Sequence, residues 1–461
     1  MRLRLMCSLA VLSTTGLFCR AGDLPEPSAE KYTLHCGAQP GRLTRVKAEL
    51  EVGGDIRVLN GAKTVTAPLS VQGSVQYDEK LIEADPKALT DRRSIRFYTA
   101  AQASIRINKD LLQPTLRPER ALIGAAVLAG QPTLYSPRGL LAGDELDLIE
   151  LPGNSLFLEL LLPADEVKIA DTWHPSDNLL AALLGIDAVS KQTVECTLSE
   201  VQHDQAIVNI NGALDGAIQG VTTTIELKAK YRFDMKLKQI TSYVMAVREK
   251  RSIGHVGPGL DVTAKLRIQI DPLETSEKLS DQALADVKLE PRPELTRIEF
   301  DSTTGGFKLE HERRWHPTDV QPAALVLRMI DRGELVAQCN VTSLAKLPEG
   351  KQDNLADFRL DVQHALGQSF VTFGDVGAGT NSRGFQVLHA YAEGKVQDLD
   401  ITWRYYLVSD KKTGRRMAFA FTLEKDLLDR LGNADQELLD HVALFEPVEK
   451  AAAKPAEAKR K

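Results

Sequence analysis

Strict alternation of apolar and polar residues dominates the first half of the chain. Between Leu260 and Ile270 every even-numbered residue is apolar and every odd-numbered residue is polar. Successive side chains of a strand point to opposite faces, so this period of two predicts a strand between a core and water. Residues 225–233 repeat the pattern, with four charged residues between five apolar ones. We therefore expect a long antiparallel β-meander over residues 30–271.

Shorter apolar runs between these two segments add to the predicted sheet. The additional strands are expected at 194–198, 206–210 and 238–247. Asn211-Gly212 and Asp215-Gly216 carry turn chemistry and predict tight turns between strands. An earlier stretch, Pro118 to Gly130, fits a short helix or a strand, and periodicity leaves both open.

One helix is well marked within this region. Pro175-Ser176-Asp177 offers N-terminal caps, Leu179 to Leu184 is apolar, and Gly185 can end the helix in a left-handed conformation. Because the segment is apolar on nearly all sides, we expect it to be buried against the sheet.

The chain becomes polar and charged after Asp271. Residues 272–296 include Glu290-Pro291-Arg292-Pro293, and prolines at this spacing favour extended, unpaired backbone. We interpret 272–296 as a linker between two domains, the second covering 297–446. The Lys-, Ala- and Glu-rich tail, 447–461, has nothing to bury and is expected to be disordered.

The second domain has mixed periodicity and is predicted to be α+β. Its expected strands are 323–330, 334–341, 385–391, 397–408 and 415–423, with turns at 331–333, 393–395 and 412–414. Residues 354–366 carry apolar side chains at helical spacing. A last helix is expected after Asp435 as its cap. An antiparallel sheet with helices is the architecture that this order favours.

The first 21 residues have the pattern of a secretory signal peptide. Arg2 and Arg4 precede a short apolar stretch, and small residues end at Ala21, so we expect cleavage there and an extracytoplasmic protein, periplasmic or secreted. Lipidation of Cys19 is the alternative. No later segment has the roughly 20 apolar residues that a membrane helix needs.

Composition excludes several classes of protein. A net charge of −6 argues against nucleic acid as a partner. Cys36, Cys196 and Cys339 remain after cleavage, which is too few for a disulfide scaffold, and at least one must be unpaired in a monomer. Cys196 alternates with outward-facing residues and should point into a core.

Two resemblances follow from particular segments. Residues 161–173, LLPADEVKIADTW, and 206–220, AIVNINGALDGAIQG, resemble a class of uncharacterised secreted bacterial proteins whose β-rich halves meet at a "P…V..GD.W" motif. Ala170 stands where that pattern has Gly. The resemblance implies a half-barrel like that of lipoprotein carriers.

The second part resembles the PsbP-like α/β/α fold. The matching features are Gly306-Phe307, Trp315, the strands around Gly333 and the run from Met417 to Leu428. Proteins of that fold act mostly as docking or accessory subunits, and neither resemblance carries a functional residue over to this chain.

Motifs that resemble catalytic or ligand sites are better explained as structure. Gly374 to Gly379 superficially resembles a phosphate loop but lacks a following helix and is expected to be a surface loop. The Gly-rich segment 254–259 predicts a hairpin, and His255 within it has no second ligand at metal spacing. His311 and His316 are five residues apart, too far for a zincin helix. Trp315 between them is expected to anchor a core or a domain contact.

Carboxylates also cluster before the helix at 177–184. Asp144, Glu145, Asp147 and Glu150 are interpreted as a solvated face. No Gly-x-Ser-x-Gly elbow is present. We therefore predict no catalytic, cofactor-binding or metal site and no enzymatic activity through a metal, a nucleotide or a nucleophilic serine or cysteine.

Three functions remain open on the sequence alone. The first is a non-enzymatic binding or carrier protein, with an apolar small ligand or an envelope protein as partner. The second is an accessory or structural subunit of a cell-envelope complex. The third is a hydrolase whose site the sequence does not reveal. An open apolar cavity in the first domain would favour the carrier, and a completely filled core would not.

Overall fold

The computed structural model describes most of the chain. The described residues are 30–61, 63–84, 88–90, 92–128, 130–348 and 351–447. The predicted signal peptide, Cys19 and nearly all of the tail at 447–461 lie outside them. Within the described residues no helix combines the length and the apolar character that crossing a membrane requires.

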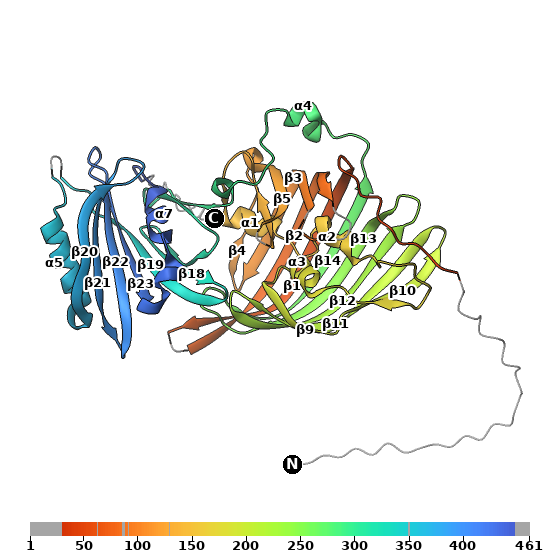
Figure 1. Cartoon of the computed structure of the whole chain (residues 1–461), viewed down its shortest axis with the longest axis horizontal. Coiled ribbons are helices and arrows are strands. Elements are labelled where there is room, and N and C mark those ends of the chain that lie inside the picture. Colours follow the sequence, from red (N-terminus) through yellow and green to blue (C-terminus); the bar gives the residue numbers. More distant parts are fainter. Residues whose placement is uncertain are drawn as a thin grey trace, which may run out of the picture.

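An antiparallel sheet of 13 strands forms most of the first part of the chain (Figure 1). Its order is β6 (Gln131–Tyr135), β5 (Leu122–Leu128), β3 (Arg92–Ile107), β2 (Lys63–Ala84), β1 (Leu43–Asn60), β14 (Gly259–Pro272), β13 (Gln239–Arg251), β12 (Val221–Asp234), β11 (Gln205–Ile218), β10 (Glu195–Gln202) and β8 (Thr172–Trp173). Two short strands pair outside this path: β4 (Asp110–Leu112) with β3, and β9 (Ala188–Gln192) with β11. The sheet is open, and the prediction of a β-rich α+β protein is confirmed.

The alternating segments are strands of this sheet, as predicted. In β14, Leu266, Ile268 and Ile270 are at most 8% exposed, whereas the polar residues between them face water. The run from Pro118 to Gly130, left open between helix and strand, contains β5 after a short 3-10 turn, η1 (Pro118–Arg120).

Two predicted turns are wrong. Asn211-Gly212 and Asp215-Gly216 both lie inside the continuous strand β11. Gly212 has a φ of 155°, and a side chain there would collide with the backbone of Thr193 and Val194, where the chain passes from β9 to β10. Close backbone approach, and not a turn, requires this glycine. The actual turn is Gln219-Gly220, where both residues have positive φ.

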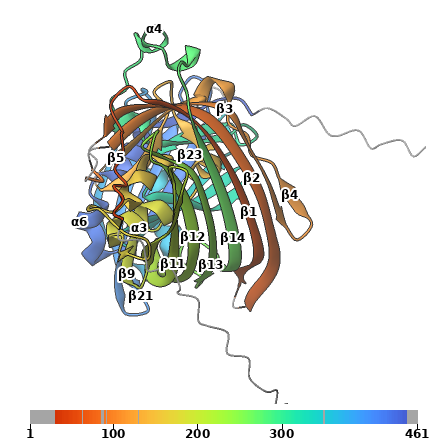
Figure 2. The ribbon, with the colours of Figure 1, turned by 90° about the vertical axis from the view of Figure 1, so that its right-hand side faces the viewer.

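Three short helices lie on the concave face of the sheet. They are α1 (Gly143–Ile149), α2 (Ser155–Leu158) and α3 (Asp177–Leu184), with η2 (Glu159–Leu161) directly after α2. Figure 2 shows the curvature of β1, β2 and β11–β14 and the position of α3 beside them. The buried leucines of these helices join the apolar face of the strands in one core.

The caps predicted for α3 are confirmed. The Ser176 side chain accepts a hydrogen bond from the Leu179 N–H at 3.3 Å, and Gly185 ends the helix with a φ of 69°. Ala170, where the resembling proteins have Gly, also has a left-handed backbone with a φ of 74°. This chain therefore keeps the turn without the glycine.

The segment 272–296 is less extended than expected. It contains η3 (Glu277–Leu279), α4 (Asp281–Leu284) and η4 (Pro293–Leu295). Leu279 and Leu284 pack against Ile95 and Leu122 of the large sheet, so apolar contacts hold this polar stretch to the first part. Its role as a domain boundary stays a prediction.

A second antiparallel sheet of seven strands follows. Its order is β17 (Trp315–Gln321), β18 (Ala324–Asp331), β19 (Glu334–Leu344), β23 (Arg416–Glu424), β22 (Leu399–Ser409), β21 (Gln386–Val396) and β20 (Phe370–Thr380). The helical elements are α5 (Leu355–Leu366), η5 (Gly367–Ser369), η6 (Lys425–Leu427), α6 (Leu428–Leu431) and α7 (Ala434–Asp440). The five predicted strands and the helix at 354–366 are confirmed.

Three details of the second part differ from expectation. Residues 374–379 are not a surface loop but part of the edge strand β20, where Gly377 leaves no room for a side chain beside the His389 ring. Gly394 lies within β21, and the turn falls three residues later at Gln397-Asp398. Asp435 does not cap α7, because it is fully buried and accepts hydrogen bonds from Arg404 and Tyr406.

Trp315 is a core residue, as expected. Its side chain is 1% exposed and meets Phe421 edge to face, with ring centroids 5.8 Å apart.

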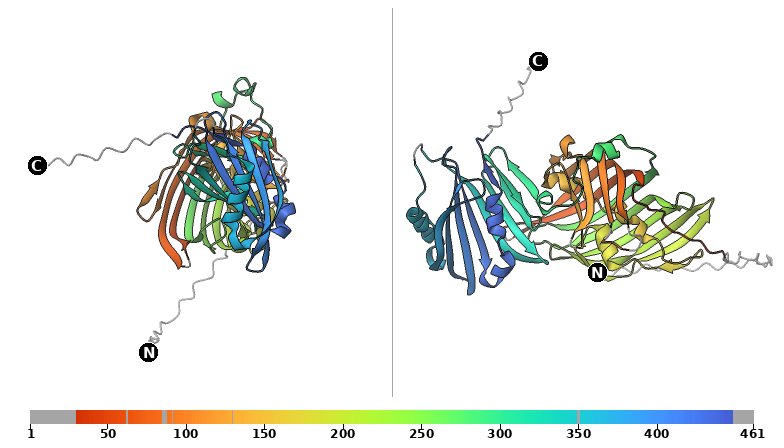
Figure 3. Two further views of the ribbon diagram at one scale, coloured as in Figure 1. Left: turned by 90° about the vertical axis from the view of Figure 1, so that its left-hand side faces the viewer. Right: turned by 45° about the horizontal axis from the view of Figure 1, so that its top comes forward.

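A third, four-stranded sheet joins the two parts. Its order is β24 (Val442–Leu444), β16 (Phe307–His311), β15 (Ile298–Ser302) and β7 (Leu141–Ala142), and β7, which immediately precedes α1, pairs in parallel with β15. Figure 3 shows the seven-stranded sheet lying beside one end of the large sheet. The Arg328 guanidinium donates to the His255 carbonyl at 2.5 Å, so the predicted hairpin at 254–259 contacts the second part.

Candidate binding cavities

Three cavities adjoin one segment of the chain, α1 and the loop after it. The loop, 150–154, crosses the concave face of the large sheet. Gly153 fixes its path, because its N–H donates to the Leu183 carbonyl at 2.6 Å and its φ is 72°. A side chain at Gly153 would collide with Leu266 and Ile268, so the loop lies directly on β14. We name the cavities the sheet pocket, the apolar groove and the interdomain cleft.

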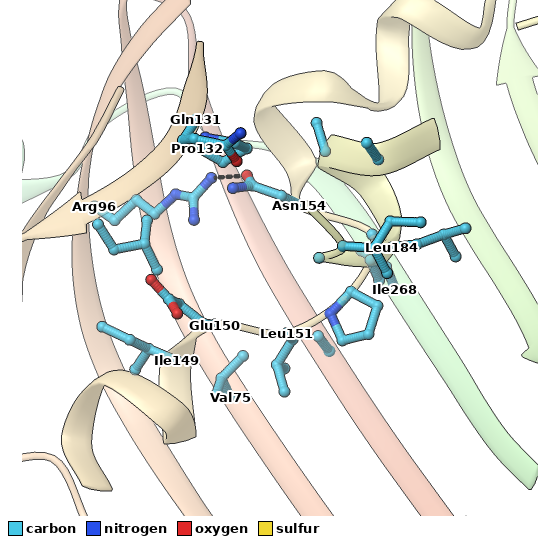
Figure 4. Close-up of a pocket in the computed structure, with 18 of the residues that line it drawn as sticks. Val75, Arg96, Gln131, Pro132, Ile149, Glu150, Leu151, Asn154, Leu184 and Ile268 are labelled. Carbon is cyan, nitrogen blue, oxygen red and sulfur yellow. Dashed lines mark hydrogen bonds between the residues drawn. The ribbon is translucent and has the colours of Figure 1, made fainter. Parts of the chain in front are cut away.

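The sheet pocket, of about 260 Å³, lies between the loop, α3 and strands β1–β3 (Figure 4). Its wall combines aliphatic side chains such as Val75 and Ile268 with polar ones, among them Arg96, Glu150 and Asn154. The Arg96 guanidinium donates to the Asn154 side-chain oxygen at 2.5 Å, which is the dashed line in Figure 4. Arg96 and Asn154 in the wall of this pocket are thus already hydrogen-bonded to each other.

Arg96 belongs to a buried network that ties β2 and β3 to α2. Its Nε donates to Glu79 at 2.7 Å, and Glu79 also accepts from the Ser94 and Ser155 hydroxyls at 2.7 Å. Burial alone would raise the pKa of Glu79, but the Arg96 charge and the two hydroxyls outweigh it and lower that pKa. Each of these groups is hydrogen-bonded to another member of the network, so we assign the network a structural role.

Glu150 is the acidic member of the sheet pocket. Burial raises its pKa, while Arg313 of the second part, at 3.0 Å, partly offsets that effect. The carboxylate is still 40% exposed, because it faces a cavity that water reaches.

The apolar groove, of about 380 Å³, continues along the same concave face beyond the helices. The described residues that line it are Leu50, Val71, Gly73, Ala103, Ile105, Leu112, Gln113, Pro114, Asp144, Asp147, Leu148 and Leu151. Strand register places the aliphatic ones on one face, since Leu50 pairs with Gly73 and Leu266, and Val71 with Ile105. This face of the sheet therefore continues past the filled core as an apolar surface.

The helices stop covering the apolar face of the sheet within a few residues along each strand. Ala48 and Val75, under the loop, are each 5% exposed. Leu50 and Val71, on the same face, are half-buried, and Leu112 on β4 is 57% exposed. An exposed apolar surface of this kind marks a binding site more often than an isolated exposed leucine does.

The interdomain cleft, of about 750 Å³, lies on the other side of α1. It is bounded by α1, β15, the start of β17, and the tips of the hairpins at Gln219 and Val256. Asp144 and Asp147 line both this cleft and the apolar groove. The two cavities thus meet at these carboxylates.

The charges of the cleft are unbalanced. Arg117 pairs with Glu145 at 2.6 Å and with Glu299 at 3.0 Å. Burial lowers the pKa of His311 and of His316, which favours their neutral forms. Neither Asp144 nor Asp147 forms an ion pair with any residue that the structure describes.

The interpretation of the acidic cluster as a solvated face is wrong for Glu145. That residue is 2% exposed, and its carboxylate also accepts the Ala142 and Arg117 N–H groups. The interpretation is confirmed for the other three members, because Asp144, Asp147 and Glu150 are exposed, although they also line cavities. The sequence showed the cluster but contained no signal for the apolar strands that it faces.

The two candidate histidines both line the interdomain cleft but have different partners. His311 is buried, and its Nδ1 donates to the Glu312 carbonyl at 2.8 Å, whereas His316 lies at the cleft beside Gln219. Among the described residues no group of three or more His, Cys, Asp or Glu side chains could hold a metal ion. Cys36, Cys196 and Cys339 are all free, and Cys196 faces the core as expected.

Comparison with known proteins gives only remote structural similarities. No protein-family model matches the chain, and no curated protein matches it. The solved structures include cyanobacterial PsbP (CyanoP) from Synechocystis, which shares 15% identity at a TM-score of 0.27 and covers 32% of this chain and 92% of its own. A protein from Bacteroides thetaiotaomicron shares 9% identity at a TM-score of 0.23, over 32% of this chain and 48% of that one, so less than two thirds of it is matched.

Proposed function

We propose that this protein is an exported, non-enzymatic binding or carrier protein that holds an apolar ligand in the apolar groove. One observation carries the proposal: the apolar face of the large sheet continues beyond the helices that cover it and forms a cavity of about 380 Å³. Pockets of small ligands fall in this range of volume and are mostly apolar with few polar groups. The signal peptide predicted for the first 21 residues is in keeping with a location outside the cytoplasm.

The groove suits an aliphatic chain in energetic terms. Burying a chain of about eight carbons is worth roughly 6 kcal/mol, at ~0.8 kcal/mol for each CH₂ group. Without other contacts or costs, that corresponds to a dissociation constant on the order of tens of micromolar. Ordering the ligand weakens the affinity further, so binding is expected between the micromolar and millimolar ranges.

Gly73 offers a test that blocks the groove without disturbing the core. A Cβ there would meet only the Ala103 and Leu50 Cβ atoms, at 3.8 and 4.0 Å, so a larger side chain would extend into the groove. Gly53 is the matched control. Like Gly73, it lies in a long strand, and an added Cβ there would have no atom within 4 Å. Gly53 pairs with Ser70 and Thr263, and a side chain at this position would point to the face of the sheet opposite the groove.

The experiment measures binding of the neutral fluorescent probe N-phenyl-1-naphthylamine and its displacement by 1-octanol. The wild type and the Gly53→Leu variant should bind both, whereas Gly73→Leu should weaken binding at least tenfold with an unchanged unfolding midpoint. Equal binding by Gly73→Leu and the wild type, or no binding by the folded wild type, would overturn the proposal.

A docking role is the second candidate, and one observation favours it. Leu360 of α5 and Val371 of the edge strand β20 are at least 50% exposed, as is Leu399 at the start of β22. We propose that the second part is PsbP-like and that this edge contacts an envelope protein. A photo-crosslinking residue at Val371 should then capture one protein of constant mass in intact cells, while the same residue at Glu226 should not.

A further inference from the structure

Two carboxylates stand where the apolar groove opens into the interdomain cleft. Asp144 and Asp147 are three residues apart on α1, so they lie on one side of the helix, and both line both cavities. Among the described residues that line the groove, they are the only charged ones, and Gln113 is the only other polar side chain. A ligand whose chain fills the groove can therefore place a polar end beside these two acids.

Nothing described in the cleft neutralises the two acids. Arg117 is the one Arg or Lys among the described lining residues, and its guanidinium is held by Glu145 and Glu299. Glu299 also pairs with Lys308, so these two cations face two glutamates and leave Asp144 and Asp147 uncompensated. Asp301, a further carboxylate of the cleft, accepts a hydrogen bond from the Thr303 hydroxyl and forms no ion pair with another described residue. His311 and His316 favour their neutral forms. The cleft thus has a negative potential at the point where the groove opens into it.

The arrangement has a cost in the unliganded protein. Both side chains are exposed to water, yet partial desolvation by the cavity walls and the neighbouring Asp144 charge raise the pKa of Asp147, so its ionised form is somewhat less favourable than in free solution. Groups that destabilise a fold in this way are typical of binding sites, where function and stability compete.

We propose that the ligand is an aliphatic amphiphile with a cationic amine head, its chain in the apolar groove and its ammonium group between Asp144 and Asp147. This inference rests on the proposed function and adds the chemical class of the ligand. An ammonium group donates three hydrogen bonds and suits two carboxylates that pair with no cation in the part of the chain that the structure describes. An anionic head would meet like charges, and a neutral head would leave both acids unpaired.

The test compares three ligands with the same chain and different heads. Octylammonium, 1-octanol and octanoate are titrated into the full-length protein by calorimetry at pH 7 and low salt, where a primary amine is protonated. Octylammonium should bind at least tenfold more tightly than 1-octanol, and octanoate more weakly than either. The advantage of octylammonium should shrink as salt is added.

A double variant isolates the carboxylates. Asp144→Asn with Asp147→Asn should remove the advantage of octylammonium, leave 1-octanol unchanged, and give an equal or higher unfolding midpoint. The control, Glu51→Gln with Glu226→Gln, removes two negative charges from exposed positions on the opposite face of the same sheet and should change neither ligand's affinity.

The outcomes separate this inference from the proposed function. If the wild type binds octanoate or 1-octanol as tightly as octylammonium, or if the double variant keeps the preference, the cationic head is refuted and the apolar groove stands. If none of the three ligands binds, or if Gly73→Leu leaves all three unaffected, the proposed function fails and this inference fails with it.

Discussion

Removing Arg96 should destabilise the first part of the protein more than the loss of any surface ion pair would. Its side chain is 2% exposed, donates to Glu79, Asn154 and Ser155, and lies 4.9 Å from the centroid of the Tyr77 ring. The variant Arg96→Met keeps much of the apolar volume but leaves the buried Glu79 carboxylate without a cation. Breaking a buried pair from one side costs about 3–5 kcal/mol, and we expect a loss in that range.

Urea unfolding at pH 7 measures this loss, and two further variants define its origin. Glu79→Met combined with Arg96→Met should recover most of the stability, because no buried charge is then left alone. Lys395→Met is the surface control. Lys395 pairs with Asp400 at 3.3 Å, both side chains are more than 60% exposed, and its loss should cost at most about 1 kcal/mol.

The pH dependence gives a second check. In the wild type the pKa of Glu79 is lowered, so its contribution is present above the unfolded pKa and is lost as pH falls through the folded one. Without Arg96, burial should raise that pKa, and the ionised carboxylate then becomes unfavourable as pH rises. The cost of Arg96→Met should therefore shrink toward pH 3. A cost below about 1 kcal/mol at pH 7, or one independent of pH, would refute this reasoning.

Three further outcomes can be checked with little effort. The pKa of Asp147 is raised in the folded protein, so its contribution to stability falls as pH rises through that pKa. The Asp147→Asn variant should therefore unfold at a higher temperature than the wild type at pH 7, but not near pH 3. Cys196 and Cys339 are fully buried, and burial raises the pKa of Cys196 to about 12, so the native protein should react with a thiol reagent at Cys36 alone, and slowly. Limited proteolysis should cut first within 272–293, and first cuts within 260–270 would contradict the predicted boundary.

Local sequence signals account for much of the fold. The period of two identified β12 and β14, and the residues around α3 specified both of its ends. Glycine was the least reliable signal. Gly212 and Gly394 suggested turns but lie inside strands, because each makes room for a neighbouring backbone, at Thr193 and Ser369. Such close approaches depend on tertiary contacts that no local pattern contains.

The apolar groove could not be predicted for a related reason. Covered and uncovered parts of the apolar face have the same alternating sequence, as in Val75 under the loop and Val71 beyond it. The face itself is assembled from strands more than 200 residues apart, since Leu50 pairs with Leu266. Where the helices stop covering it depends on the path of the loop over β14, which Gly153 fixes.

The location of a bound chain tests the central claim most directly. A photoreactive octanol carrying a diazirine at the end of its chain can be activated in complex with the folded protein, and the labelled residues can be identified by mass spectrometry. Labels should fall in 50–73, 103–114 and 144–151, which contain all the described residues that line the groove, and should disappear in Gly73→Leu. Labels concentrated instead on Leu360, Val371 or Leu399 in the second part, or unaffected by that substitution, would contradict a carrier role for the large sheet.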